Sequence, residues 1–157
     1  WLQLLSKHPQ ADFLMHYLGQ QAAFYKEPRV LNFMIQQHQK FDLIQYLPFQ
    51  EALEAYERAL QKEPSQSQNL LATFTDFIIK QDFFDLSNQT CERILEYLNV
   101  QPYSISAAQF IKISYYFPVS MEHSIDKWLL KKDINYQLTN SLHQTKEILE
   151  IKKRINS

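Results

Sequence analysis

A single glycine, Gly19, is the feature that most constrains what this 157-residue chain can fold into. Average usage of about 7% would supply about 11 glycines. Glycine provides backbone conformations with positive φ and lets the backbone approach a phosphate closely. The chain therefore cannot carry a glycine-rich dinucleotide loop, a P-loop or a nucleophile elbow. Hairpin turns built on Asn-Gly or Asp-Gly are absent as well, which argues against an antiparallel β fold.

The bulk composition is typical of a folded, water-soluble domain. With 45% hydrophobic and 14% aromatic residues the chain can build a core, and its length suits one domain over 1–157. The net charge of −1 gives no global attraction to nucleic acid or to an anionic membrane, and no apolar run is long enough to span a bilayer. One cysteine, Cys91, excludes an intramolecular disulfide and indicates a reducing compartment. We expect an intracellular protein, cytoplasmic or organellar, with mitochondria included.

Six prolines act as boundaries between expected helices. They fall at positions 9, 28, 48, 64, 102 and 118. Proline is accepted in the first turn of a helix or just beyond its end, and resisted between. Within the segments that the prolines delimit, apolar residues recur with the spacing of one helix face. The pattern predicts helices near 1–7, 11–25, 28–40, 48–62, 66–80, 84–99, 104–116, 120–131 and 133–155.

Two short segments leave alternatives open. Residues 41–47 fit a short helical turn or the tail of the preceding helix. Residues 104–117 alternate like a strand, but the helical surroundings favour a helix there. Ser104 and Asp85 stand where helix N-caps are expected. Gly19 itself lies inside an expected helix, where we interpret it as a notch for close packing of a neighbouring helix.

Similar residues recur at an offset of 33–35 positions. Glu57-Arg58-Ala59-Leu60 returns as Glu92-Arg93-Ile94-Leu95, and Phe77-Ile78 returns as Phe110-Ile111. This offset is the length of one helical hairpin, that is, two helices with two short loops. The recurrence predicts stacked helical hairpins over residues 28–131, followed by a long amphipathic helix over 133–155.

The segment from Ala52 to Pro64 resembles the second helix of a tetratricopeptide repeat. That family places a small residue, an aromatic residue, a second alanine and a boundary proline, and here Ala52, Tyr56, Ala59 and Pro64 fill these places. The helix before it lacks the tryptophan, Leu-Gly and tyrosine of the family. The resemblance, which extends to pentatricopeptide-like hairpins, implies an all-α fold of eight or nine antiparallel helices stacked as hairpins into a short α-solenoid. An irregular α-bundle is the alternative.

No group of residues has the spacing of a catalytic or metal site. The five histidines form neither H-x-x-x-H nor H-E-x-x-H, and one cysteine cannot supply a cysteine-rich zinc pattern. The nearest cluster, Glu122-His123 with Asp126, is more typical of a helix surface. Ala52, Tyr56 and Ala59 are expected to serve packing. We therefore expect no catalysis, no cofactor, no metal and no small-molecule substrate.

The expected function is that of a non-catalytic protein–protein interaction scaffold or adaptor, a subunit of a larger complex whose partners are other protein subunits. This expectation rests on analogy with the fold, and a fold alone does not fix a function. Residues 41–100 hold ten acidic and four basic side chains, a pattern that fits solvated helix faces or, as the alternative, an acidic partner-facing surface. The aromatic candidates are expected to be exposed. The candidate partner-binding residues are Glu51, Glu54, Glu57, Asp76, Tyr115, Tyr116 and Trp128.

Two alternative functions remain. The first is an organellar RNA-binding or ribosome-associated helical-repeat protein, because basic side chains gather near the C-terminus beside aromatic rings on which bases stack. The second is a helical effector or regulatory domain of a longer chain. The candidate RNA-contacting residues are Lys127, Lys131, Lys132, Lys152, Lys153 and Arg154.

Overall fold

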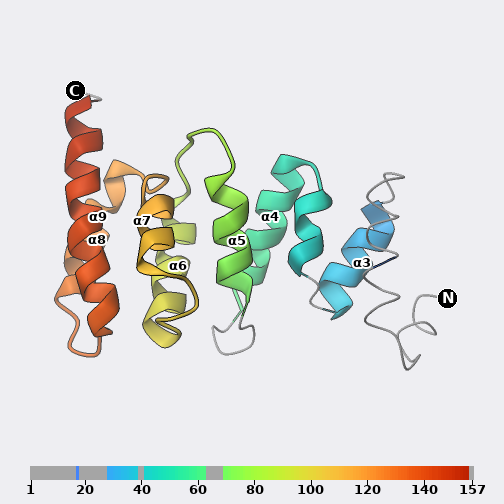
Figure 1. The fold of residues 1–157 in the computed structure, drawn as a ribbon, viewed down its shortest axis with the longest axis horizontal. Helices are drawn as coiled ribbons and strands as arrows, with labels where there is room; N and C mark the ends of the chain where they lie inside the picture. Colours follow the sequence, from blue (N-terminus) through green and yellow to red (C-terminus); the bar gives the residue numbers. More distant parts are fainter. Residues whose placement is uncertain (1–16, 18–27, 39–40, 63–68, 156–157) are drawn as a thin grey trace. The chain divides into compact units, whose positions relative to one another are not determined.

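The fold is all-α in the computed structural model. The residues that the structure describes are 17, 28–38, 41–62 and 69–155. Within them the chain forms seven α-helices and two short 3₁₀ helices, and no β-strand (Figure 1). The expected fold class is therefore confirmed. The helices expected near 1–7 and 11–25, Gly19 included, lie outside the described residues apart from Tyr17.

Two compact units divide the chain, residues 1–57 and residues 58–157. The single domain expected over 1–157 stays a prediction. Helix α4 runs across the boundary between them. The elements are α3 (Pro28–His38), η1 (Phe41–Tyr46), α4 (Phe49–Leu60), α5 (Leu70–Ile79), α6 (Asn88–Val100), α7 (Ala107–Ser114), η3 (Val119–Met121), α8 (Glu122–Leu129) and α9 (Tyr136–Ile155).

The helix positions agree with the sequence pattern, and the open segments are resolved. The 3₁₀ helix η1 occupies the segment at 41–47, and α7 replaces the strand alternative at 104–117. A capping box starts α7, because Ser106 accepts from the Gln109 amide while the Gln109 side chain accepts from the Ser106 amide. The N-caps expected at Ser104 and Asp85 are wrong by two residues each, since Ser106 and Ser87 hold these positions.

The first unit packs α3, η1 and the first part of α4 around a small apolar core. Leu31 and Met34 of α3 are buried, as are Leu43 and Ile44 of η1. Tyr56 of α4 is fully buried, and its hydroxyl donates to the Phe41 carbonyl at 3.4 Å. Ala52 beside it is buried too, and Ala59, in the part of α4 that belongs to the second unit, is also buried, so the packing role expected for these three residues is confirmed.

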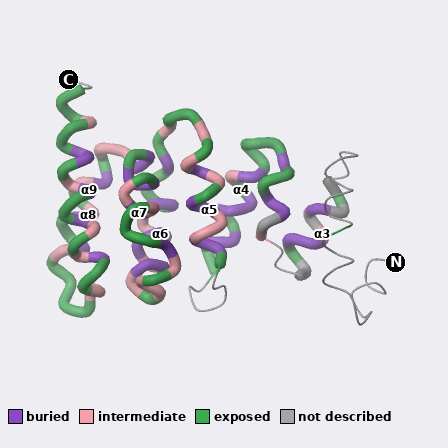
Figure 2. The backbone as a smooth tube through the Cα atoms, viewed as in Figure 1, coloured by how far each residue is buried: buried purple, intermediate pink, exposed green. Residues whose placement is uncertain are grey.

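The second unit arranges its helices in two layers. Helices α5, α7 and α9 lie side by side, and α6 and α8 form the other layer (Figure 1). Buried positions gather where the layers meet (Figure 2). Phe110 and Phe117 pack there edge to face, with ring centroids 6.1 Å apart. The buried apolar side chains of the helices in this unit include Leu70, Leu71, Phe74, Ile78, Ile94, Leu95, Phe110, Ile113, Ile125, Leu138, Leu142 and Leu149.

Helices of the second unit end without glycine. The C-cap residues of α5, α6, α7 and α8 all have negative φ, from −63° to −126°. Side chains that lie 35 residues further along the chain bind carbonyls just beyond two helix ends. The Tyr97 hydroxyl donates to the Lys62 carbonyl at 3.0 Å, and the Tyr116 hydroxyl donates to the Gln81 carbonyl at 2.7 Å. The first hydrogen bond joins α6 to the residues just after α4, and the second joins the residues just after α7 to those just after α5.

Replacing Tyr116 by Phe should lower the free energy of unfolding by about 1–2 kcal/mol, because the Gln81 carbonyl loses its donor in a largely buried place. Urea denaturation followed by circular dichroism measures this change. The matched control is Tyr136→Phe, since the Tyr136 ring is 77% exposed; it should change stability by less than about 0.5 kcal/mol. If the Tyr116→Phe variant is as stable as the parent chain, the hydrogen bond from Tyr116 to the Gln81 carbonyl does not stabilise the fold.

Candidate functional site

An apolar groove lies in the second unit, and we call it the Phe83 groove. Its walls come from the loop between α5 and α6, from the C-terminal end of α7 and from about the last two turns of α9. Its volume is about 480 Å³, within the range of pockets that bind ligands. The lining residues are Phe83, Phe84, Asp85, Tyr115, Ile148, Ile151, Lys152 and Ile155.

The loop wall is held in place by the end of α7. Leu86 is buried, and its amide donates to the Tyr116 carbonyl at 2.8 Å. The Tyr116 ring stacks on Phe83 at a centroid distance of 5.5 Å and meets Phe84 edge-on at 5.6 Å. Tyr116 also binds this loop through its hydroxyl, as described above. A buried tyrosine therefore fixes the loop from which Phe83 projects.

The groove presents large apolar side chains to solvent. Phe83 is 79% exposed and Ile155 is 75% exposed, with Ile151 and Tyr115 at about half. Single exposed hydrophobic residues are common on protein surfaces, but a cluster from separate segments marks an interaction site more often than chance. Ile151 and Ile155 lie one turn apart on α9, so they face the same side of that helix.

Lys152 lines the groove, and all its hydrogen-bond donors are engaged. Its ammonium group binds Asp85 at 2.9 Å, the Tyr115 carbonyl at 3.0 Å and the Phe117 carbonyl at 2.7 Å. An ammonium group has three N–H donors, so these contacts use the full set. A cation near the last carbonyls of a helix also interacts favourably with the helix dipole. Lys152 therefore fastens α9 to the end of α7 and to the loop.

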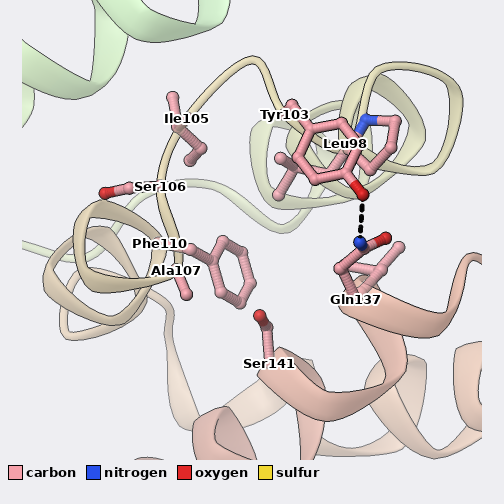
Figure 3. A pocket seen from close by; sticks show the side chains of 10 residues that line it. Leu98, Tyr103, Ile105, Ser106, Ala107, Phe110, Gln137 and Ser141 are labelled. Atoms are coloured by element: carbon pink, nitrogen blue, oxygen red, sulfur yellow. Dashed lines mark hydrogen bonds between the residues drawn. The ribbon is translucent and has the colours of Figure 1, made fainter.

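A smaller pocket of about 180 Å³ lies between the turn that follows α6 and the start of α9 (Figure 3). The Phe110 ring and the Ser141 hydroxyl face it, and the Gln137 side-chain amide donates to the Tyr103 hydroxyl at its edge. Its lining is mostly apolar and holds no titratable side chain besides Tyr103. This pocket offers no pair of groups for acid–base chemistry.

The basic residues proposed to contact RNA are largely engaged within the second unit. Lys152 is bound as described, and Lys153 lies 3.4 Å from Glu122. Lys131 lies over the Trp128 ring, 3.6 Å from its centroid. Lys127, Lys132 and Arg154 are exposed.

The expected exposure of the aromatic candidates is correct for Tyr115 and wrong for Tyr116 and Trp128. Tyr116 is 5% exposed because its ring and hydroxyl anchor the loop between α5 and α6. Trp128 is 4% exposed, and its indole N–H donates to the Glu92 carboxylate at 2.7 Å, which joins α8 to α6. Both large amphipathic rings bury their apolar bodies and satisfy their polar atoms inside the unit.

The acidic candidates do not form one site within either unit. Glu51 and Glu54 are exposed on α4 in the first unit, where the Gln50 side chain donates to Glu54 at 3.3 Å. Glu57 is half-buried on the same helix. Asp76 is exposed on α5 of the second unit and accepts from Gln109 at 3.4 Å. Their part in partner binding stays a prediction.

Sequence reasoning missed the apolar residues that line the groove. Phe83 and Phe84 lie in the loop between α5 and α6, because α6 begins at Asn88 and not near residue 84 as the sequence pattern predicted. Ile151 and Ile155 extend the apolar face of the last helix into its basic end. Both pairs are visible in the sequence, but only the folded chain brings them together.

Chemistry-bearing groups of the described residues are dispersed. No group of three His, Cys, Asp or Glu side chains in the described part of the chain is arranged to hold a metal ion. Cys91 is buried in α6, and burial, followed by the nearby Glu92 carboxylate, raises the pKa of its thiol. Asp126 binds Lys146 at 2.7 Å and not His123 on its own helix. This hydrogen bond raises the pKa of Lys146.

No described helix is long and apolar enough to cross a membrane.

No family model, no curated protein and no solved structure matches the chain. The tetratricopeptide resemblance therefore stays a prediction, as does the function that it implies.

Replacing Lys152 by Met should lower the free energy of unfolding by about 1–3 kcal/mol, because two helix-end carbonyls lose a donor and Asp85 loses its ion-pair partner. Thermal and urea denaturation measure the loss. Lys127→Met is the matched control, since Lys127 is exposed on α8, and it should shift stability by less than about 0.5 kcal/mol. A Lys152→Met variant as stable as this control would show that Lys152 does not fasten α9.

Proposed function

We propose that this chain is a non-catalytic protein–protein interaction scaffold or adaptor that binds a segment of a partner protein in the Phe83 groove. The observation that carries the proposal is the gathering of four exposed apolar side chains, from three separate segments, around one groove. Contiguous exposed apolar surface of this kind favours a docking role. A subunit of a larger complex, placed in the cytoplasm or an organelle, is the setting that we propose for it.

The rigidity of the groove supports this proposal. Preformed walls reduce the ordering cost of binding, and here buried Tyr116 and Leu86 hold the loop while Lys152 holds α9. The exposed residues can therefore meet a partner without a large rearrangement. Tyr116, Leu86 and Lys152 hold the groove in shape, and Phe83 also packs on the Tyr116 ring, so a binding experiment on a Phe83 variant needs a parallel measurement of stability.

RNA binding is the second candidate, and one observation favours it. Lys127, Lys131 and Lys132 lie within six positions of one another on α8 and its C-terminal turn, and all three are exposed. Clustered lysines attract phosphate groups in a salt-dependent manner. Against this candidate, Trp128 is buried and offers no exposed face on which a base could stack.

A displayed library of peptides about 16 residues long, panned on the whole chain, tests the proposed groove. We expect enriched peptides whose affinity falls at least tenfold on the Phe83→Ser variant, because the aromatic anchor of the site is removed. Fluorescence anisotropy of the labelled peptides measures the change. Leu130→Ser is the matched control, since Leu130 is 84% exposed and lines neither pocket.

Circular dichroism should show the same fold for both variants. Urea denaturation should show a loss of about 0.5–1.5 kcal/mol for Phe83→Ser, because the ring contact with Tyr116 is lost, and no such loss for Leu130→Ser. If no enriched peptide distinguishes Phe83→Ser from Leu130→Ser, the groove is not a binding site. If the chain instead binds RNA oligonucleotides at low salt and charge reversal at the three lysines abolishes that binding, the RNA candidate replaces the scaffold.

A further inference from the structure

Exposed apolar side chains also gather at the end of the second unit that lies opposite the loop carrying Phe83. They come from residues 100–106, which lead from α6 to α7, and from residues 130–136, which lead from α8 into α9. Figure 1 shows both turns at the same end of the unit, and we call this end the turn surface. In the described part of the second unit, every other exposed large apolar side chain belongs to the Phe83 groove. The exposed apolar side chains of the turn surface are Leu130 (84%), Tyr103 (80%), Tyr136 (77%) and Val100 (57%).

Hydrogen bonds between the two turns hold these side chains on one surface. The Asn135 amide donates to Oδ1 of Asn99 at 2.7 Å, and the Gln137 side-chain amide donates to the Tyr103 hydroxyl (Figure 3). Oδ1 of Asn135 also accepts from the Gln137 backbone amide at 2.9 Å, which fixes the start of α9. The two turns therefore have their arrangement before any partner binds.

The charge at the turn surface is positive. Asp133 is the single acidic residue of 100–106 and 130–136, whereas three exposed lysines lie on these turns or in the last turn of α8. None of the three forms an ion pair with a described residue. Asp126, the nearest carboxylate along α8, is already bound by Lys146. The positive charge is therefore available to an anionic partner. The three lysines are Lys127, Lys131 and Lys132.

The apolar side chains of the turn surface are placed to insert into a partner. Val100, Leu130 and Tyr136 line neither the Phe83 groove nor the smaller pocket, so they do not enclose a ligand there. A membrane interface accepts protruding side chains without a matching pocket. An aliphatic chain reaches the acyl region, a tyrosine ring stays among the headgroups, and lysine attracts anionic lipids. RNA suits this surface less well, because aliphatic side chains such as Leu130 and Val100 offer no ring on which a base stacks.

From these observations we propose that the turn surface attaches the protein reversibly to a membrane that contains anionic lipids. Leu130 enters the boundary of the acyl region, Tyr103 and Tyr136 lie among the headgroups, and the three lysines bind lipid phosphate and carboxylate groups. Attachment is weak and salt-dependent, since few groups take part. It does not depend on the docking function of the Phe83 groove, because that groove lies at the opposite end of the unit, where it stays open to a partner protein.

Flotation of the whole chain with lipid vesicles tests the proposal. At low salt the chain should bind vesicles of phosphatidylcholine with about 30% phosphatidylserine about tenfold more tightly than vesicles of phosphatidylcholine alone. Raising the salt concentration to about 0.5 M should reduce this ratio, because salt screens the attraction. Leu130→Ser should lower the affinity for the anionic vesicles roughly fivefold. The double variant Lys127→Glu/Lys132→Glu should lower it at least about tenfold.

Matched controls come from the opposite end of the unit. Ile155→Ser removes an apolar side chain of similar exposure, and Lys80→Glu/Lys112→Glu changes the net charge equally at exposed lysines near the ends of α5 and α7. Both should bind the anionic vesicles within about twofold of the parent chain. If the chain does not bind these vesicles, or if each variant binds like its control, the proposal is overturned. Binding to an RNA oligonucleotide in place of vesicles, or a self-association that Leu130→Ser abolishes, would also overturn it.

Discussion

The packing of the second unit depends on how the carbonyl groups at its helix ends are hydrogen-bonded. A helix leaves its last carbonyls without partners, and many proteins close this end with a glycine in the left-handed region. This chain has one glycine, at position 19, and the C-cap residues of α5 to α8 keep negative φ. Side chains that lie 35 residues further along the chain, those of Tyr97, Tyr116 and Lys152, bind backbone carbonyls at or just beyond helix ends. The same hydrogen bonds thus satisfy carbonyl groups at the end of one helix and attach a later segment of the chain to it.

The same dependence explains why the Phe83 groove lies where it does. Tyr116 and Lys152 both bind carbonyls at or beyond helix ends, and both also bind the loop that carries Phe83, through Gln81 and Asp85 respectively. Side chains committed to these carbonyls cannot also bind a partner, which leaves Phe83, Ile151 and Ile155 as the exposed apolar surface. A binding surface built beside such structural anchors is rigid without requiring catalytic or cofactor-binding groups.

The fold class and the helix positions could be read from the sequence, because proline boundaries and apolar spacing are local signals. Capping at Ser106 and the 3₁₀ helix at Phe41–Tyr46 refine these positions by a few residues. The site was harder to predict. Tyr116 and Trp128 were expected on the surface because a sequence does not show that a carbonyl or carboxylate about 35 residues away awaits their polar atoms. The anchoring role of Lys152 was missed for the same reason, since a lysine in a basic tail is ordinarily solvated and the sequence does not show which carbonyls it binds.

Native-state hydrogen exchange in a Tyr97→Phe variant tests most directly whether the stability of a helix end depends on a hydrogen bond from a side chain about 35 residues further along the chain. The Tyr97 hydroxyl binds the Lys62 carbonyl, and the Gln61 and Lys62 amides close the end of α4 by donating to Arg58 and Ala59. The account predicts faster exchange at these two amides, about 35 positions before the substitution, with little change around residue 97 itself. Unchanged exchange at Gln61 and Lys62, or a change confined to α6, would contradict it.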